Sequence, residues 1–206
     1  MLQRNLKILT LSMLALSAGA QETPEAPEAP EVPFFMPTPE GWRTETIPFP
    51  LGFAPELAYE GLEEIRFAPG MFEEGAEDFW SYAFVWWVPS ATSFDAETLS
   101  KDLENYFRGL SQAVAQGRGF DPGEAVFAAS IAAQAADEGS QRFAGRVQTL
   151  DAFATRRPIE LDVRIEIWAC EGQERRVAFF SLSPQPPSHA IWQTLHSLRE
   201  GFRCES

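Results

Sequence analysis

Residues 161–182 of this 206-residue chain, LDVRIEIWACEGQERRVAFFSL, predict a β-hairpin. Apolar and polar residues alternate through the first half, and successive side chains of a strand point to opposite faces of a sheet. Residues 171–174 supply the turn, and residues 177–182 form the returning strand. One face should therefore lie in a core and the other in solvent. The apolar set is Leu161, Val163, Ile165, Ile167 and Ala169, and the polar set is Asp162, Arg164 and Glu166.

Strands are also predicted on the N-terminal side of this hairpin. Residues 62–67, LEEIRF, alternate as a half-buried strand does, and residues 41–48 favour a short edge strand ended by prolines. Residues 79–88, FWSYAFVWWV, are apolar at both parities, which is typical of a central strand covered on both sides. Residues 143–150 predict a further strand. The Ala-rich residues 124–135 allow a helix by propensity, but the turn signal after them favours a strand.

Two longer segments have helical periodicity. Residues 94–114 place apolar side chains at helical spacing, with Asp95 as the N-cap and Gly117 at the end. The second helix is expected to start at Ser188 as its N-cap and to end at Gly201. Strands joined by short turns, with a helix after each group, predict an α+β domain. We expect a single twisted antiparallel sheet with two main helices packed against it, an α/β sandwich.

This element order over residues 41–204 resembles that of PsbP-like α/β sandwiches. More locally, LDAFAT at residues 150–155, SP at 183–184, IW at 191–192 and FRC at 202–204 resemble exported bacterial proteins of unknown function. The resemblance implies an extracytoplasmic domain with a Cys170–Cys204 bridge. It implies no reaction, because a fold by itself does not define a function.

The N-terminal 40 residues have the composition of targeting and spacer segments. Residues 1–20 predict a secretory signal peptide, with Arg4 and Lys7 before a short apolar run and Ala18-Gly19-Ala20 as the cleavage site. An uncleaved membrane anchor is the alternative. Residues 21–40 predict a disordered Pro/Glu-rich linker, which leaves residues 41–206 as one domain. The protein is therefore expected in the periplasm or outside the cell.

The net charge of −14 becomes −16 when Arg4 and Lys7 leave with the signal peptide. Such a chain repels phosphate backbones, so nucleic acid is excluded as a partner, and anionic membrane surfaces are disfavoured. A protein or a small ligand remains as the expected partner.

The two cysteines, Cys170 and Cys204, lie at the ends of predicted elements. In an oxidising compartment this pair is best interpreted as a structural disulfide, because a metal site needs more ligands.

No catalytic residues, metal ligands or cofactor are predicted. A hydrolase triad needs a nucleophile, a base and an orienting acid, yet His189 and His196 are the only histidines and no G-x-S-x-G motif is present. The acidic residues 73–78 do not have the spacing of an EF-hand loop. We therefore expect a non-catalytic domain, and an unrecognised hydrolase is the least favoured alternative.

The tryptophans are the remaining candidates for a site. Trp86, Trp87 and Trp168 lie on neighbouring predicted strands, near Trp80 and Tyr82, and flat aromatic faces can bind sugars or other small ligands. Core packing is the competing interpretation. Trp168 has the parity of the polar face, unless it packs under a helix. The leading hypothesis is a protein-interaction module, and the second is carbohydrate or small-ligand binding through these tryptophans.

Overall fold

The computed structural model describes residues 32–205. Seven strands form one sheet in the order β1-β2-β3-β7-β6-β5-β4, and every neighbouring pair is antiparallel. The predicted α+β class is confirmed. The strands are β1 (Arg43–Pro48), β2 (Leu62–Phe67), β3 (Tyr82–Pro89), β4 (Ala128–Gln134), β5 (Ser140–Leu150), β6 (Pro158–Cys170) and β7 (Arg175–Ser183).

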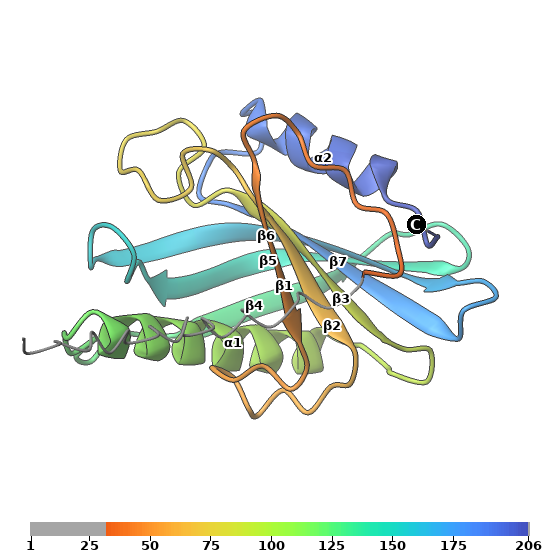
Figure 1. Cartoon of the computed structure of the whole chain (residues 1–206), viewed down its shortest axis with the longest axis horizontal. Helices are drawn as coiled ribbons and strands as arrows, with labels where there is room; N and C mark the ends of the chain where they lie inside the picture. Colours follow the sequence, from red (N-terminus) through yellow and green to blue (C-terminus); the bar gives the residue numbers. More distant parts are fainter. Residues whose placement is uncertain (1–31, 206) are drawn as a thin grey trace, which may run out of the picture.

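The two helices, α1 (Ala96–Gly117) and α2 (Ile191–Gly201), lie on opposite sides of a strongly twisted sheet (Figure 1). Helix α1 covers the face that buries Phe84 and Phe180, whereas α2 covers the face that buries Val85 and Phe179. Each face of the sheet thus has its own apolar core. This arrangement explains why β3, the third of the seven strands, is apolar at both parities.

The hairpin of residues 161–182 is formed by β6 and β7, whose register ends at the Cys170–Arg175 pair. Leu161, Val163 and the other aliphatic residues up to Ile167 are buried against the α1 side, as predicted, but Ala169 is exposed. The polar face of this hairpin is not fully exposed to solvent. Helix α2 lies over it, and Arg199 of α2 donates to Glu166 with an N–O distance of 2.8 Å. The solvent-facing interpretation of this side was therefore wrong where α2 covers it.

Local signals in the sequence account for several element ends. Asp95 caps α1, since its Oδ1 accepts from the Thr98 N–H at 2.8 Å. Residues 128–134 form a strand, which decides the helix-or-strand ambiguity. Ser188 does not cap the last helix, which begins at Ile191. Instead, Nδ1 of His189 accepts the Ile191 N–H at 3.2 Å, so this histidine has a structural contact at the helix start.

The folded domain begins before residue 41. Phe34 and Met36 are buried in the core under α2, and Phe35 forms a β-bridge with Arg203. The Arg66 guanidinium donates to the backbone carbonyls of Met36 and Pro37. The linker predicted over 21–40 is therefore too long at its C-terminal end, because apolar side chains in residues 34–37 find a core that the local composition does not reveal.

Strand β2 is also buried more deeply than its alternating pattern suggested. Glu63, Glu64 and Arg66 are all buried, and Arg66 pairs with Glu64, which also accepts from the Thr46 hydroxyl. A buried charge is tolerated only when it is paired and hydrogen-bonded, and these contacts supply that pairing.

The signal peptide predicted at 1–20, and the linker up to residue 31, lie outside the described residues. Neither helix of residues 32–205 has the length and apolarity needed to cross a membrane.

Candidate functional site

A cavity of about 460 Å³ lies between the N-terminal edge of the sheet and helix α1. Its floor is formed by β1, β2 and β3. The register aligns Arg43 of β1 with Phe67 of β2, and Phe67 with Tyr82 of β3, so these side chains form one row across the floor. Glu45 and Ile65 form the next row. The cavity has the size typical of small-molecule sites, which usually occupy 300–1,000 Å³.

The roof of the cavity is the C-terminal half of α1 together with a neighbouring loop. Tyr106, Leu110 and Val114 lie at helical spacing on α1 and line the cavity on the side opposite the sheet. Phe53 joins them because Gly109 lets the helix approach the loop closely. A Cβ atom at Gly109 would lie 1.9 Å from the carbonyl oxygen of Phe53, which no side chain could tolerate. The absence of a side chain at Gly109 therefore positions Phe53 at the roof.

Trp80 and Phe72 form an end wall together with Met71 and Phe153. Trp80 has φ of 51°, in the left-handed region that a bulky residue rarely adopts. This conformation costs about 1–2 kcal/mol. Burial of the indole against Phe153 and its backbone hydrogen bond to the Met71 carbonyl hold it in place. Strained residues of this kind are concentrated at functional sites, where the surrounding structure determines their position.

Two polar groups in the cavity lining lack partners among the described residues. They are the hydroxyl of Tyr82, whose side chain is 2% exposed, and the indole N–H of Trp80, which is 1% exposed. The Trp80 indole lies toward Asp151, although the two do not meet hydrogen-bond geometry. Burial opposes the charge of Asp151, but hydrogen bonds from Thr155 and Ala154 hold its pKa below its usual range. Tyr82 therefore offers the clearer free hydrogen-bonding group.

Glu63 is fully buried directly behind the roof residue Tyr106, whose hydroxyl donates to Glu63 Oε1 at 2.7 Å. Burial raises the Glu63 pKa to about 8, against the opposing effect of the hydrogen bond from Tyr106. Trp86, the cross-strand neighbour, presents its indole to the same carboxyl. Burial also raises the pKa values of Tyr82 and Tyr106 well above their usual range, and the nearby Glu63 charge adds to both shifts. The site therefore holds an uncharged carboxyl at pH 7.

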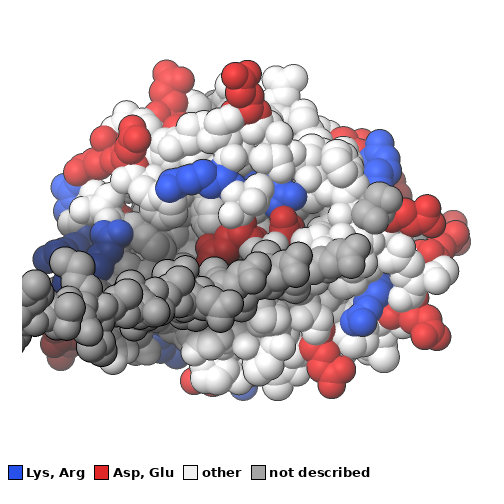
Figure 2. All heavy atoms as spheres, viewed as in Figure 1, with Lys and Arg blue, Asp and Glu red and all other residues white. Residues whose placement is uncertain are grey.

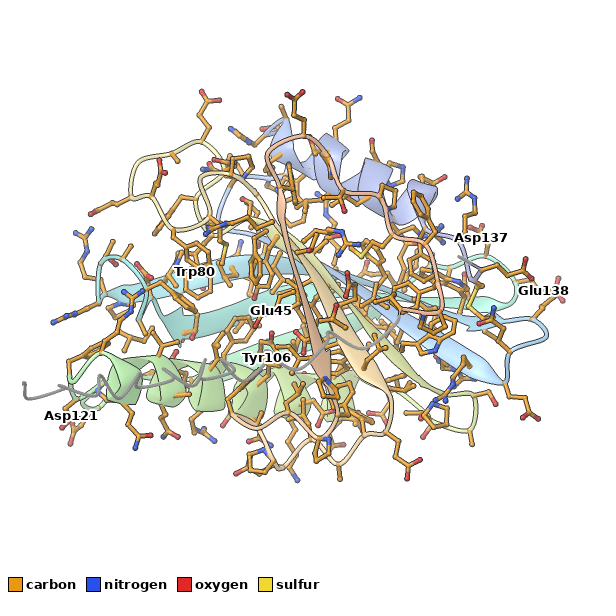
Figure 3. All side chains as sticks on the ribbon, in the orientation of Figure 1. Glu45, Trp80, Tyr106, Asp121, Asp137 and Glu138 are labelled. Atoms are coloured by element: carbon orange, nitrogen blue, oxygen red, sulfur yellow. A yellow bond between two sulfur atoms is a disulfide. The ribbon has the colours of Figure 1, made fainter. Side chains whose placement is uncertain are left out.

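The rim of the cavity carries its two charged lining residues, Arg43 and Glu45 of β1. Both are exposed, and neither forms an ion pair with another residue in the range 32–205. The Arg43 guanidinium lies over the Phe72 ring, with Cζ 4.7 Å from the ring centroid. Figure 3 shows Glu45 and Tyr106 near the centre of the molecule and Trp80 further to the left, and all three line the cavity.

The tryptophans predicted to bind a ligand are not at this cavity. Trp86 is 0% exposed and Trp87 is 3% exposed, so both are core residues on opposite faces of β3. Their assignment as ligand-binding residues was wrong, because both faces of the strand are covered. Trp168 is half-buried on β6, where the Arg199 guanidinium stacks on its ring at 4.5 Å and Phe202 packs edge-on. It packs under α2, which was the alternative for this residue.

The disulfide prediction is confirmed, since Cys170 and Cys204 are bonded with their Cα atoms 5.7 Å apart. The bond joins the end of β6 to the chain just after α2. Neither histidine lies at the cavity: His189 accepts the Ile191 N–H at the start of α2, and His196 is exposed on the same helix. Within the described part of the chain, no three His, Cys, Asp or Glu side chains converge as metal ligands do.

Sequence reasoning missed most of the residues that line the cavity. Tyr106 lies in the predicted helix of residues 94–114, and Phe153 lies in the segment 150–155 that carries the resemblance. Phe72 falls in the loop between the predicted strands 62–67 and 79–88. The spacing of these three residues does not relate them to one another. A signal was present in Arg43 and Glu45, two charges with the parity of Ile47 on one strand. Charged residues at one end of a strand face that is otherwise directed to the core indicate that this end of the face reaches solvent.

No family model, no curated protein and no solved structure matches this chain, so the interpretation depends on the geometry of the cavity.

Proposed function

We propose that this protein is an exported, non-catalytic domain that binds a small, largely apolar ligand in the cavity between β1–β3 and α1. The observation that carries the proposal is the 460 Å³ cavity itself, whose lining is largely apolar and includes Tyr82, a residue with a buried, unpartnered hydroxyl. A buried hydroxyl without a partner costs about 1–3 kcal/mol. A ligand that hydrogen-bonds to Tyr82 would recover this cost and would be oriented by it.

Small-ligand binding is supported better than the leading protein-interaction hypothesis. A stable protein interface generally needs more than about 1,000 Å² with good complementarity, and it usually has a large apolar patch. Among the residues described, only Phe35 and Val126 are large hydrophobic side chains with high exposure, and they belong to different regions of the chain. The cavity, in contrast, concentrates apolar surface in a concave site. The Cys170–Cys204 disulfide supports an oxidising location for this binding function.

Binding of the neutral fluorophore N-phenyl-1-naphthylamine tests the proposal directly, because this dye becomes bright in an apolar cavity. We expect saturable binding to purified protein with one site per chain. Replacing Leu110 by Trp should abolish it by filling the cavity from the roof. The matched control is Val126→Trp, which adds the same indole at a position that is 65% exposed and outside the cavity lining.

Thermal unfolding of both variants shows whether each is folded before its dye binding is compared. If Leu110→Trp fails to fold, Val114→Phe provides a smaller obstruction on the same helix face. Equal dye binding by the wild type and a folded cavity-filled variant would contradict the proposal, since the dye would then bind elsewhere.

A further inference from the structure

The walls of the cavity are unusually rich in aromatic rings for an apolar site. Rings from all sides of the cavity line it, including Phe53 from the roof, Phe67 and Tyr82 from the floor, and Phe72 and Trp80 from the end wall. The face of an aromatic ring carries partial negative charge, so a ring wall attracts cations as well as apolar groups. Aliphatic side chains of the same size would offer equal apolar area without this preference.

The one acidic residue in the cavity lining favours the same sign of ligand. Glu45 lies at the rim with no ion pair to any residue that the structure describes. Glu63, which lies behind Tyr106, is uncharged at pH 7 and adds no charge to the site, so Glu45 is the charged carboxylate of the lining. The whole chain carries a net charge of −14, and acidic side chains lie around the edge of the face drawn in Figure 2, with basic side chains between them. This field raises the local concentration of cations and lowers that of anions.

We propose that the ligand is an organic cation with an apolar body, such as an alkylated or aromatic amine, whose positive group lies among the aromatic walls near Glu45. This inference rests on the proposed ligand-binding function and specifies the class of ligand.

Arg43 is the one basic residue in the lining, and its position supports this assignment. Its guanidinium already lies 4.7 Å from the centroid of the Phe72 ring, so an aromatic wall of the cavity holds a cation in the free protein. A carboxylate ligand could reach Arg43 only at the rim, where Glu45 lies on the same face of β1 and the two opposite charges offset each other. Inside the rim the lining is uncharged, so it has no cation that would hold an anion.

A pair of probes with the same shape and different charge tests the inference. Benzyltrimethylammonium is a permanent cation, and neopentylbenzene is its neutral counterpart with carbon in place of nitrogen. Their affinities can be compared by competition with N-phenyl-1-naphthylamine and by ligand-observed NMR. We expect the cation to bind about tenfold more tightly, as a cation–π contact and a partly screened carboxylate provide. Glu45→Gln should reduce this preference, whereas Glu56→Gln, at an exposed position outside the lining, should leave it unchanged.

The possible results separate the inference from the function on which it rests. Equal affinities for the two probes, with the dye still bound in the cavity, would overturn the cationic ligand class and leave small-ligand binding intact. Failure of both probes and of the dye to bind would overturn both proposals. A cation preference that survives Glu45→Gln in full would contradict the placement of the positive group near Glu45.

Discussion

Replacing Glu63 by Gln should remove a large pH dependence from the stability of this protein. The folded-state pKa of Glu63 is raised from 4.5 to about 8 by burial. The folded protein therefore keeps a proton that the unfolded chain has already released, and stability falls as pH rises through this interval. Its contribution is complete below about pH 4.5 and is lost by about pH 8. Each pH unit costs about 1.4 kcal/mol in the middle of the interval and less near either pKa, so pH 5 to pH 8 costs roughly 3 kcal/mol.

Urea unfolding of the wild type and Glu63→Gln at several pH values measures this effect. Glutamine keeps an oxygen that can accept the Tyr106 hydrogen bond but cannot ionise. The free energy of unfolding of Glu63→Gln relative to the wild type should therefore increase by roughly 3 kcal/mol between pH 5 and pH 8. Glu56→Gln, which alters an exposed carboxyl, should show a constant difference. Tyr106→Phe removes a hydrogen bond that favours the charged form, so it should raise the Glu63 pKa further.

A difference between Glu63→Gln and the wild type that stays constant within about 0.5 kcal/mol from pH 5 to pH 8 would refute the reasoning. The carboxylate would then be as well solvated as in the unfolded chain, and its burial behind Tyr106 would not hold in solution. An NMR titration of the Glu63 side-chain carboxyl gives an independent reading, with a midpoint expected near pH 8.

Three further predictions concern the cavity, its roof and the disulfide. Tyr82→Phe should stabilise the free protein by about 1 kcal/mol in urea unfolding, because it removes an unpartnered buried hydroxyl, while it weakens ligand binding in the dye assay; a loss of stability would indicate that the hydroxyl has a partner. Gly109→Ala should destabilise by about 1–3 kcal/mol, since its Cβ would lie 1.9 Å from a loop carbonyl oxygen, whereas Gly117→Ala, with nothing within 4 Å, should be neutral or stabilising by calorimetry; equal effects would contradict the close approach. Replacing Cys170 and Cys204 together by Ser should cost about 4 kcal/mol on the chain-entropy account of a 34-residue separation, and an unchanged melting temperature would contradict a structural role.

The sequence by itself determined the elements whose causes are local. Alternation in residues 161–167 defines the β6–β7 hairpin, and apolar residues at both parities mark β3 as a central strand. Asp95 caps α1 because its carboxylate reaches a backbone N–H three residues ahead. The two cysteines pair because they are the only cysteines in the sequence and the fold brings the ends of their elements together. Each of these features depends on residues that are near in sequence or on a single possible pairing.

The tertiary structure alone decided where the sheet leaves space and which charges become buried. Glu64 and Arg66 alternate with apolar neighbours as solvent-facing residues do, yet residues 34–37 cover them, and backbone carbonyls about 30 positions away complete the pairing. The cavity lies between β1–β3 and α1, and the missing side chain at Gly109 allows α1 to contact the loop that brings Phe53 into the lining. Periodicity reports which face of an element is apolar. It does not report whether the opposing layer fills the volume above that face, because filling depends on packing between residues far apart in the chain.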